Sequence, residues 1–147
     1  MNNGLGRAVE ATALAATDLG YIAALLANHP EYRGFPIACL QAWIIPALAH
    51  GQARVFFDEK GSAVGYLTWA YFADDVSDRW VNDPAVLLHL SEWNEGGDLW
   101  ILDFFAVPGY ARIILDEVRV NMFLGEAAAF SIRRTRPGRM KATRWRR

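Results

Sequence analysis

The chain has 147 residues, of which 53% are hydrophobic and 13% aromatic. This length suits one domain with a core of its own, so we expect a single domain over residues 1–147. The composition excludes an intrinsically disordered protein, and no apolar run approaches the roughly 18 residues of a membrane span. The single cysteine leaves no internal disulfide, and no hydrophobic segment leads into a signal-peptide cleavage site. We therefore expect a cytoplasmic protein.

The net charge of −1 hides a strong asymmetry along the chain. Residues 133–147 carry eight of the fifteen basic residues and no acid, whereas residues 1–132 carry seven basic and sixteen acidic ones. A basic C-terminal segment of this kind favours an acidic partner such as a phosphate, a nucleic acid or an acidic carrier protein. The simpler alternative is a solvated tail that only aids solubility.

The predicted elements alternate between helices and strands. Residues 1–16 are rich in alanine without a clear start signal, which is typical of a frayed helix, and Thr17 or Asp18 is the expected N-cap of a helix over about 19–28. Further helices are expected over about 37–49, with a kink or a new start at Pro46, and over 75–93 and 111–122. Strands are expected over 54–57, 63–70, 100–107, 128–134 and 139–145. This order predicts an α/β fold with a mixed, largely antiparallel central sheet flanked by helices.

The most informative residue is Asp103, the single carboxylate in the apolar stretch WILDFFAV over residues 100–107. Both faces of this stretch are apolar, which predicts a central strand buried on both sides. A buried and unpaired carboxylate costs several kcal/mol or changes its pKa instead. Asp103 must therefore have a partner or face a cleft, either as a structural hydrogen-bond hub or as a site residue.

The other reactive side chains give weaker signals. Three isolated histidines without an i,i+4 pair or a cysteine cluster predict no metal site. Cys39, between apolar neighbours on a predicted helix, is either a buried small hydrophobe or a thioester-carrying nucleophile. No glycine-rich nucleotide loop is present, and no pyrophosphate loop of the kind that binds coenzyme A.

Five short motifs stand in the order, and at nearly the spacing, of a known family. They are Pro30-x-x-Arg33-x-Phe35-Pro36, Ile45-Pro46-Ala47 with Gln52 following, Val64-x-Tyr66-x-x-Trp69-Ala70, Asn82-Asp83, and Gly97-Asp98-x-Trp100-x-x-Asp103-x-x-Ala106. In these motifs the chain resembles the toxin-activating lysine acyltransferases, the hemolysin-activating family that attaches fatty acyl groups to internal lysines of RTX toxins. The likeness covers roughly residues 19 to 140.

The resemblance implies a GNAT-like acyltransferase fold and a homodimer. It implies no bound cofactor, because the acyl donor is a co-substrate: the phosphopantetheine thioester of acyl carrier protein, acyl-ACP, rather than acyl coenzyme A. Asp103 falls where the family places a catalytic aspartate, which works with a histidine from the loop after the first helix. Such a pair removes a proton from lysine, whose amine has a pKa of about 10.4 and is almost wholly protonated at neutral pH.

The chain departs from the family at this histidine. Tyr32 stands at the matching position, and His29 lies three residues earlier. Three arrangements are open. His29 takes over from a different backbone position, or Tyr32 acts as an acid or orienting hydroxyl while Asp103 accepts the proton directly or through water. In the third arrangement the protein is a non-catalytic relative.

The remaining candidate residues would bind substrates. Trp69 and Trp100 are candidates for the wall of an apolar acyl-chain groove, with core packing as the alternative. Arg33, beside the site loop, is a candidate for contact with the phosphopantetheine phosphate. Arg133 and Arg134 are candidates for docking the acidic carrier protein by charge complementarity.

We therefore predict an acyltransferase that moves a fatty acyl group from acyl carrier protein to a lysine-type amine, lysine or ornithine, of a protein or a ribosomal precursor peptide. The alternative is a non-catalytic binding module whose basic C-terminal segment binds an acidic partner or nucleic acid. Nucleic acid is the weaker of these because aromatic residues do not interleave with the arginines except at Trp145. The sequence leaves open the acyl chain length, the acceptor and the oligomeric state.

Overall fold

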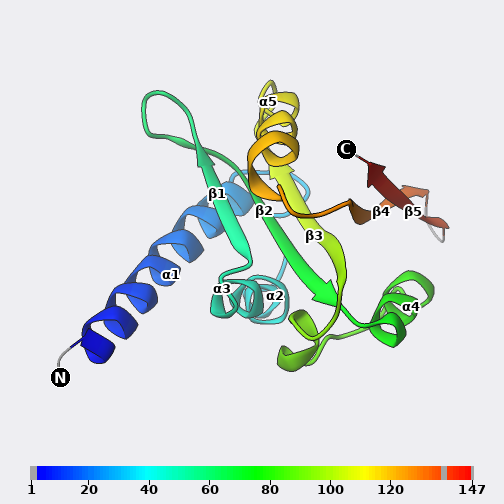
Figure 1. Cartoon of the computed structure of the whole chain (residues 1–147). Helices are drawn as coiled ribbons and strands as arrows, with labels where there is room; N and C mark the ends of the chain where they lie inside the picture. Colours follow the sequence, from blue (N-terminus) through cyan, green and yellow to red (C-terminus); the bar gives the residue numbers. More distant parts are fainter. Residues whose placement is uncertain (1–2, 137–138, 147) are drawn as a thin grey trace.

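The computed structural model describes residues 3–136 and 139–146. Five strands form one sheet in the order β1-β2-β3-β4-β5, with bounds Ala53–Phe57, Ala63–Phe72, Asp98–Ala106, Ala128–Arg136 and Arg139–Arg146 (Figure 1). Neighbouring strands are antiparallel except β3 and β4, which are parallel. The predicted α/β fold with a mixed, largely antiparallel sheet is confirmed.

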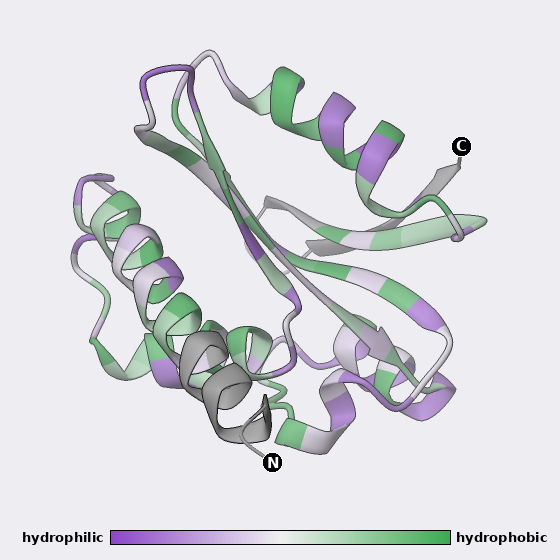
Figure 2. Ribbon diagram, turned by 60° about the vertical axis from the view of Figure 1, so that its left-hand side comes forward, coloured by the Kyte–Doolittle hydropathy of each residue, from purple (hydrophilic) through white to green (hydrophobic). Residues whose placement is uncertain are grey.

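Helices cover both faces of this sheet. They are α1 (Asn3–Ala27), α2 (Ala38–Trp43), α3 (Ile45–Ala49), α4 (Asp74–Asn82) and α5 (Ala111–Glu117), with a 3₁₀ helix η1 (Leu90–Trp93) and a π-helical turn η2 (Val118–Met122). Figure 2 shows α1 and α5 on opposite sides of the sheet. On the α1 side, Ile22 and Ile44 pack against Tyr66 and Phe105. On the α5 side, the buried core includes Leu67, Leu99, Ile101, Ile114 and Val118. Strand β3 is therefore buried between two apolar layers, as its sequence predicts.

Two helices differ from their predicted bounds. The N-cap predicted at Thr17 or Asp18 is wrong, because alanine favours helix and the alanine-rich segment extends α1 back to Asn3. The Thr17 hydroxyl donates instead to the Ala13 carbonyl oxygen, one turn earlier, at 3.0 Å. The helix predicted over 75–93 ends at Asn82, because Pro84 disfavours the helical conformation at the residue before it.

Gln52 fastens the middle of β2 to the segment that precedes β3. Its buried side-chain amide donates to the carbonyl oxygens of Trp69, at 2.9 Å, and of Trp93, at 2.8 Å. Its own backbone carbonyl accepts the Trp69 N–H at 3.0 Å. These bonds hold β2 next to Thr68, where its register with β3 shifts.

Replacing Gln52 by Leu is expected to lower the free energy of unfolding by about 1–3 kcal/mol, because the carbonyl groups of Trp69 and Trp93 lose their donor. Chemical denaturation measures this cost. Gln41→Leu is the matched control, since Gln41 is exposed on α2 and its replacement is expected to cost less than about 0.5 kcal/mol. Equal midpoints and slopes for the two variants would contradict the role given to Gln52.

Candidate active site

A β-bulge decides which side of the sheet Asp103 occupies. In the register between β2 and β3, Thr68 pairs with Asp103 but Trp69 pairs with Ile101, so Leu102 is an extra residue. Regular alternation would place Asp103 on the same face as Ile101, which packs on the α5 side. The bulge instead places Asp103 on the α1 side, with Tyr66 and Phe105. Bulges of this kind commonly re-aim side chains beside active sites.

The carboxylate of Asp103 is bonded to a buried tyrosine. The Tyr66 hydroxyl donates to Asp103 Oδ2 at 2.5 Å, and the Tyr66 ring, fully buried, stacks on Phe105. Burial raises the pKa of the Asp103 carboxyl above its ordinary range, although the bonds from Tyr66 and from the Phe104 N–H lower it in part. Burial and the charge of Asp103 also raise the pKa of Tyr66, so this hydroxyl stays protonated and donates.

Tyr32 reaches the same region from the loop after α1. This loop is a run of tight turns, in which the Tyr32 N–H bonds the His29 carbonyl and the Phe35 N–H bonds the Tyr32 carbonyl. The Tyr32 ring packs edge-on against Phe105, with 5.9 Å between ring centroids. Burial, followed by the charges of Asp103 and Glu31, raises the pKa of the Tyr32 hydroxyl. Tyr32 is therefore close enough to Asp103 to sense its charge.

His29 lies behind Tyr32 in this loop. Its Nδ1 accepts the Glu31 backbone N–H at 3.2 Å, and its ring packs against Phe105 and Tyr32 with centroid separations of 5.2 and 5.1 Å. A neutral ring that accepts at Nδ1 carries its proton on Nε2. Tyr32 and Asp103 line a common cavity, and His29 is not among the described residues that line it.

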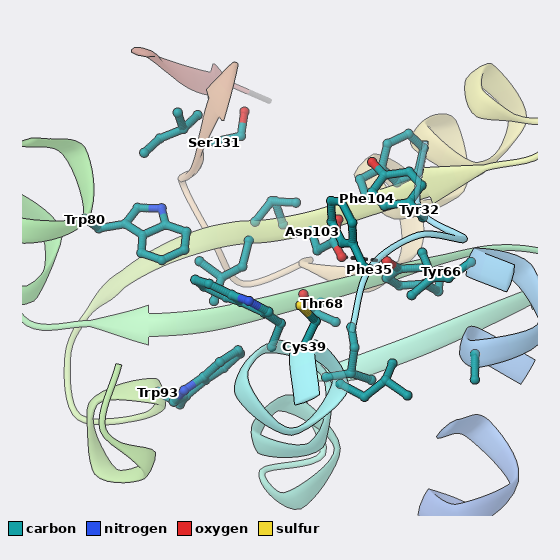
Figure 3. Close-up of a pocket in the computed structure, with 18 of the residues that line it drawn as sticks. Tyr32, Phe35, Cys39, Tyr66, Thr68, Trp80, Trp93, Asp103, Phe104 and Ser131 are labelled. Atoms are coloured by element: carbon teal, nitrogen blue, oxygen red, sulfur yellow. Dashed lines mark hydrogen bonds between the residues drawn. The ribbon is translucent and has the colours of Figure 1, made fainter. Parts of the chain in front are cut away.

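A cavity of about 1460 Å³ opens where β3 and β4 part, and it contains Asp103. Among the described residues, the two strands pair at two positions, Trp100 with Phe130 and Ile101 with Ser131. Beyond them, the cavity is bounded by β3 residues 101–104, by β4 residues 131 and 132, by α1, α2 and the loop between them, and by α5. Figure 3 shows Tyr32, Phe35 and Cys39 around Asp103, Tyr66 and Thr68, with Trp80 and Trp93 toward the other end. The volume exceeds the roughly 300–1,000 Å³ of ordinary small-molecule pockets, so it suits a long ligand.

Residues 12–145 match the RTX toxin acyltransferase family, over most of the chain and across all five strands. The chain belongs to this family. The resemblance carried by the five sequence motifs is thereby confirmed.

Several named relatives are similar to this family member. It is 32% identical over 101 residues to the RTX-II toxin-activating lysine-acyltransferase ApxIIC of Actinobacillus pleuropneumoniae, a stretch that covers 69% of this chain and 62% of that protein. It is 27% identical over 101 residues to the leukotoxin-activating lysine-acyltransferase LtxC of Aggregatibacter actinomycetemcomitans, covering 69% and 59% of the two chains. With the lysine-acyltransferase RtxC of Vibrio cholerae the identity is 26% over 101 residues, covering 68% and 65%. The match thus spans about 59% to 65% of the length of these relatives.

The predicted substrate-binding residues of this RTX toxin acyltransferase family member lie in different parts of the structure, and only some of them line the cavity. Arg33 lines the cavity beside Tyr32. Trp69 lies on the α5 side, where its ring packs edge-on against Phe123, and Trp100 is buried, stacks on Phe130 and donates to the Ser77 hydroxyl at 3.0 Å. Neither tryptophan is among the described residues that line the cavity, so both fit the core-packing alternative better. The side chains of Arg133 and Arg134 fall outside the described part of the structure.

The sequence patterns did not identify several other residues of the cavity. Tyr66 stands in one of the motifs, but only the strand register shows that its hydroxyl meets Asp103. Two further arginines, Arg119 from η2 and Arg144 from β5, line the cavity together with Arg33. They come from distant parts of the chain, so no local sequence signal connects them.

The described residues meet the requirements of neither a metal site nor a membrane-spanning helix. Among residues 3–136 and 139–146, no group of three or more His, Cys, Asp or Glu side chains is arranged to hold a metal ion. Within the same ranges, no helix combines the length and the apolar character needed to cross a membrane.

Proposed function

We propose that this chain transfers a fatty acyl group from acyl carrier protein to a lysine-type side-chain amine, lysine or ornithine, of a protein or a ribosomal precursor peptide. One observation carries most of the weight: Asp103 is a tyrosine-bonded carboxylate inside a large, mainly apolar cavity, in a member of the RTX toxin acyltransferase family. Such a cavity has room for a long acyl chain next to a group that can accept a proton.

The reaction needs the acceptor amine in its neutral form, which is rare for lysine at neutral pH. Asp103 accepts the proton, and burial makes it a stronger base than a surface carboxylate because its pKa is raised. The amine nitrogen then attacks the thioester carbonyl carbon. The new C–N bond forms and the C–S bond breaks. The attacking nitrogen, now positively charged, loses a second proton, which the phosphopantetheine sulfur takes as it leaves as a thiol. The proton first taken by Asp103 passes to solvent, so the products are a neutral amide and a thiol.

Of the three arrangements that the sequence leaves open, the placement of Tyr32 favours the one in which Asp103 is the base. Tyr32 lines the cavity with Asp103, and its raised pKa keeps the hydroxyl protonated, so it can donate to a substrate or a bridging water. His29, by contrast, has Nδ1 occupied by the Glu31 N–H. In this arrangement Tyr32 orients the reacting groups and Asp103 carries the proton.

The cavity wall supports an acyl substrate. Apolar side chains from α1, α2, α5 and the junction between α2 and α3 surround it, including Leu26, Leu40, Leu115 and Ile44. Transfer of a methylene group from water to such a wall is worth about 0.8 kcal/mol, so a long chain would be held mainly by the hydrophobic effect.

The charges on the cavity support an anionic donor arm. Arg33, Arg119 and Arg144 line it, whereas Asp83 is the single acid besides Asp103 among the described lining residues. The phosphopantetheine arm of a carrier protein carries a phosphodiester, which arginine binds well. The absence of a coenzyme A pyrophosphate loop favours the carrier-bound arm over free coenzyme A.

Replacing Arg33 by Ala is expected to raise the KM for acyl-ACP by about tenfold with little change in kcat, because a charge-assisted bond to the phosphate is lost. Steady-state consumption of the acyl-ACP thioester, at saturating acceptor, measures both constants. Arg112→Ala is the matched control, since Arg112 is exposed on α5 and does not line the cavity. An unchanged KM for Arg33→Ala would remove Arg33 from the donor site.

A non-catalytic relative is the second candidate, and tyrosine in place of the family histidine is the observation that favours it. The two candidates are separated by incubating the protein with acyl carrier proteins charged with medium to long chains and with peptides that contain lysine or ornithine. Thioester loss that requires both protein and peptide supports the transferase. Tight carrier binding without thioester loss, for every chain length and peptide, supports the binding module.

A further inference from the structure

Thr68 carries a buried hydroxyl group to which none of the described residues forms a hydrogen bond. The residue is fully buried in the middle of β2 and lines the cavity, yet its hydroxyl oxygen has no hydrogen-bond partner among the described residues. Figure 3 shows its side chain in the interior of the cavity, between Asp103 and Cys39. A buried hydroxyl without a partner is uncommon in a folded protein and calls for an explanation.

The position of Thr68 ties it to the reacting groups. It is the direct pair of Asp103 across the antiparallel strands, and such pairs have Cα atoms about 4.5–5.5 Å apart. Its other neighbour, Ala53 on β1, has a small side chain. Tyr66, two residues earlier on the same face, already donates to Asp103, so the Thr68 hydroxyl is the donor on this strand that is left for a substrate.

We propose that the Thr68 hydroxyl donates a hydrogen bond to the carbonyl oxygen of the acyl thioester and stabilises the negative charge on that oxygen during attack. When the C–N bond forms, the carbonyl π pair moves to the oxygen, and it returns when the C–S bond breaks. A donor already fixed at that oxygen lowers the barrier most, because it need not reorganise. This inference rests on the proposed function and makes Thr68 a further catalytic residue.

The proposal predicts that Thr68→Val lowers activity without lowering stability. Thr68→Val keeps the branched shape but removes the hydroxyl, so kcat is expected to fall roughly tenfold or more. The melting temperature is expected to stay the same or rise, because an unpaired polar group is removed from the interior. Thr68→Ser retains the hydroxyl and is expected to keep kcat within about threefold. Thr17→Val, on the exposed surface of α1, is the control.

Steady-state kinetics with acyl-ACP and a lysine peptide, together with thermal melts, test the proposal. A fall in kcat for Thr68→Val, with both KM values unchanged and with rescue by Thr68→Ser, supports it. Wild-type kcat in Thr68→Val overturns it, as does a rise in the amine KM alone, which would assign the hydroxyl to the acceptor. A lower melting temperature for Thr68→Val also overturns it, because the hydroxyl would then have a structural partner. If the wild-type protein transfers no acyl group, the proposed function itself fails.

Discussion

Replacing Asp103 by Asn is expected to lower kcat for acyl transfer by about 10²- to 10⁴-fold, the range in which a general base contributes to catalysis. Asparagine fills the same space, and its carbonyl oxygen can still accept the bond from Tyr66. It cannot take a proton from the acceptor amine at neutral pH. The loss should therefore appear in kcat, with smaller changes in the KM values for the two substrates.

The same variant should fold as well as the wild type or better. Burial raises the Asp103 pKa above its value in the unfolded chain. This group therefore favours the folded state most at acidic pH, below the unfolded pKa, and its contribution is lost as the pH rises through the folded pKa. The asparagine side chain does not ionise and has no such loss, so the stability difference in favour of Asp103→Asn should grow from acidic to neutral pH. Denaturation at several pH values measures this trend.

Asp116→Asn is the matched control for both measurements, because Asp116 is exposed on α5 and lies outside the cavity. If Asp103→Asn retained near-wild-type kcat, Asp103 would be a structural hydrogen-bond hub, and the transfer would need another base. If the variant unfolded at neutral pH, the assignment of Asp103 as a destabilised, functional carboxylate would be wrong.

Replacing Tyr66 by Phe is expected to move the acidic limb of the pH–rate profile to higher pH. The Tyr66 hydroxyl stabilises the charged form of Asp103, so its removal raises the Asp103 pKa further and leaves less carboxylate to act as a base. A bond from a neutral donor to a charged group is worth about 1.5–3 kcal/mol, which corresponds to a roughly 10- to 100-fold lower rate on the acidic side of the limb. The rate at alkaline pH should recover in large part.

The kcat/KM profile of Tyr66→Phe against pH measures this shift. Phenylalanine keeps the ring that stacks on Phe105, so packing should be preserved. Tyr110→Phe is the control, because Tyr110 packs on the α5 side of the sheet, away from Asp103. A uniform loss of rate at all pH values would show that Tyr66 acts through something other than the ionisation of Asp103.

Local sequence patterns were sufficient for the strand that carries Asp103 but not for its orientation. A long apolar run around one carboxylate predicts a strand buried on both sides, and β3 is such a strand. Because both faces are apolar, the alternation of the residues cannot say which face the carboxylate takes. The bulge at Leu102 determines the face on which Asp103 lies, and this bulge depends on the pairing with β2 rather than on the sequence of β3.

The site also contains residues that the sequence motifs indicate and residues that only the strand pairing reveals. The motifs pointed to Asp103, Tyr32 and Arg33, which the structure brings to one cavity. They could not pair Tyr66 and Thr68 with Asp103, because those contacts arise from strand register across 37 and 35 positions of sequence. Trp69 and Trp100 were candidates for the wall of an acyl-chain groove, which must be long and apolar. In the folded chain, Trp69 packs on the α5 side of the sheet, whereas Trp100 packs in a core with Phe72 and Trp93.

The central claim is that this cavity transfers an acyl group to an amine with Asp103 as the base. The most direct measurement is the intact mass of a lysine-containing peptide after a single turnover with acyl-ACP, for the wild type and for Asp103→Asn. We predict that the wild type adds one acyl group to the lysine side chain as the carrier loses it, and that Asp103→Asn leaves the peptide unmodified on the same timescale. Equal acylation by both proteins, or carrier binding with no acylated peptide for any chain length, would contradict the account.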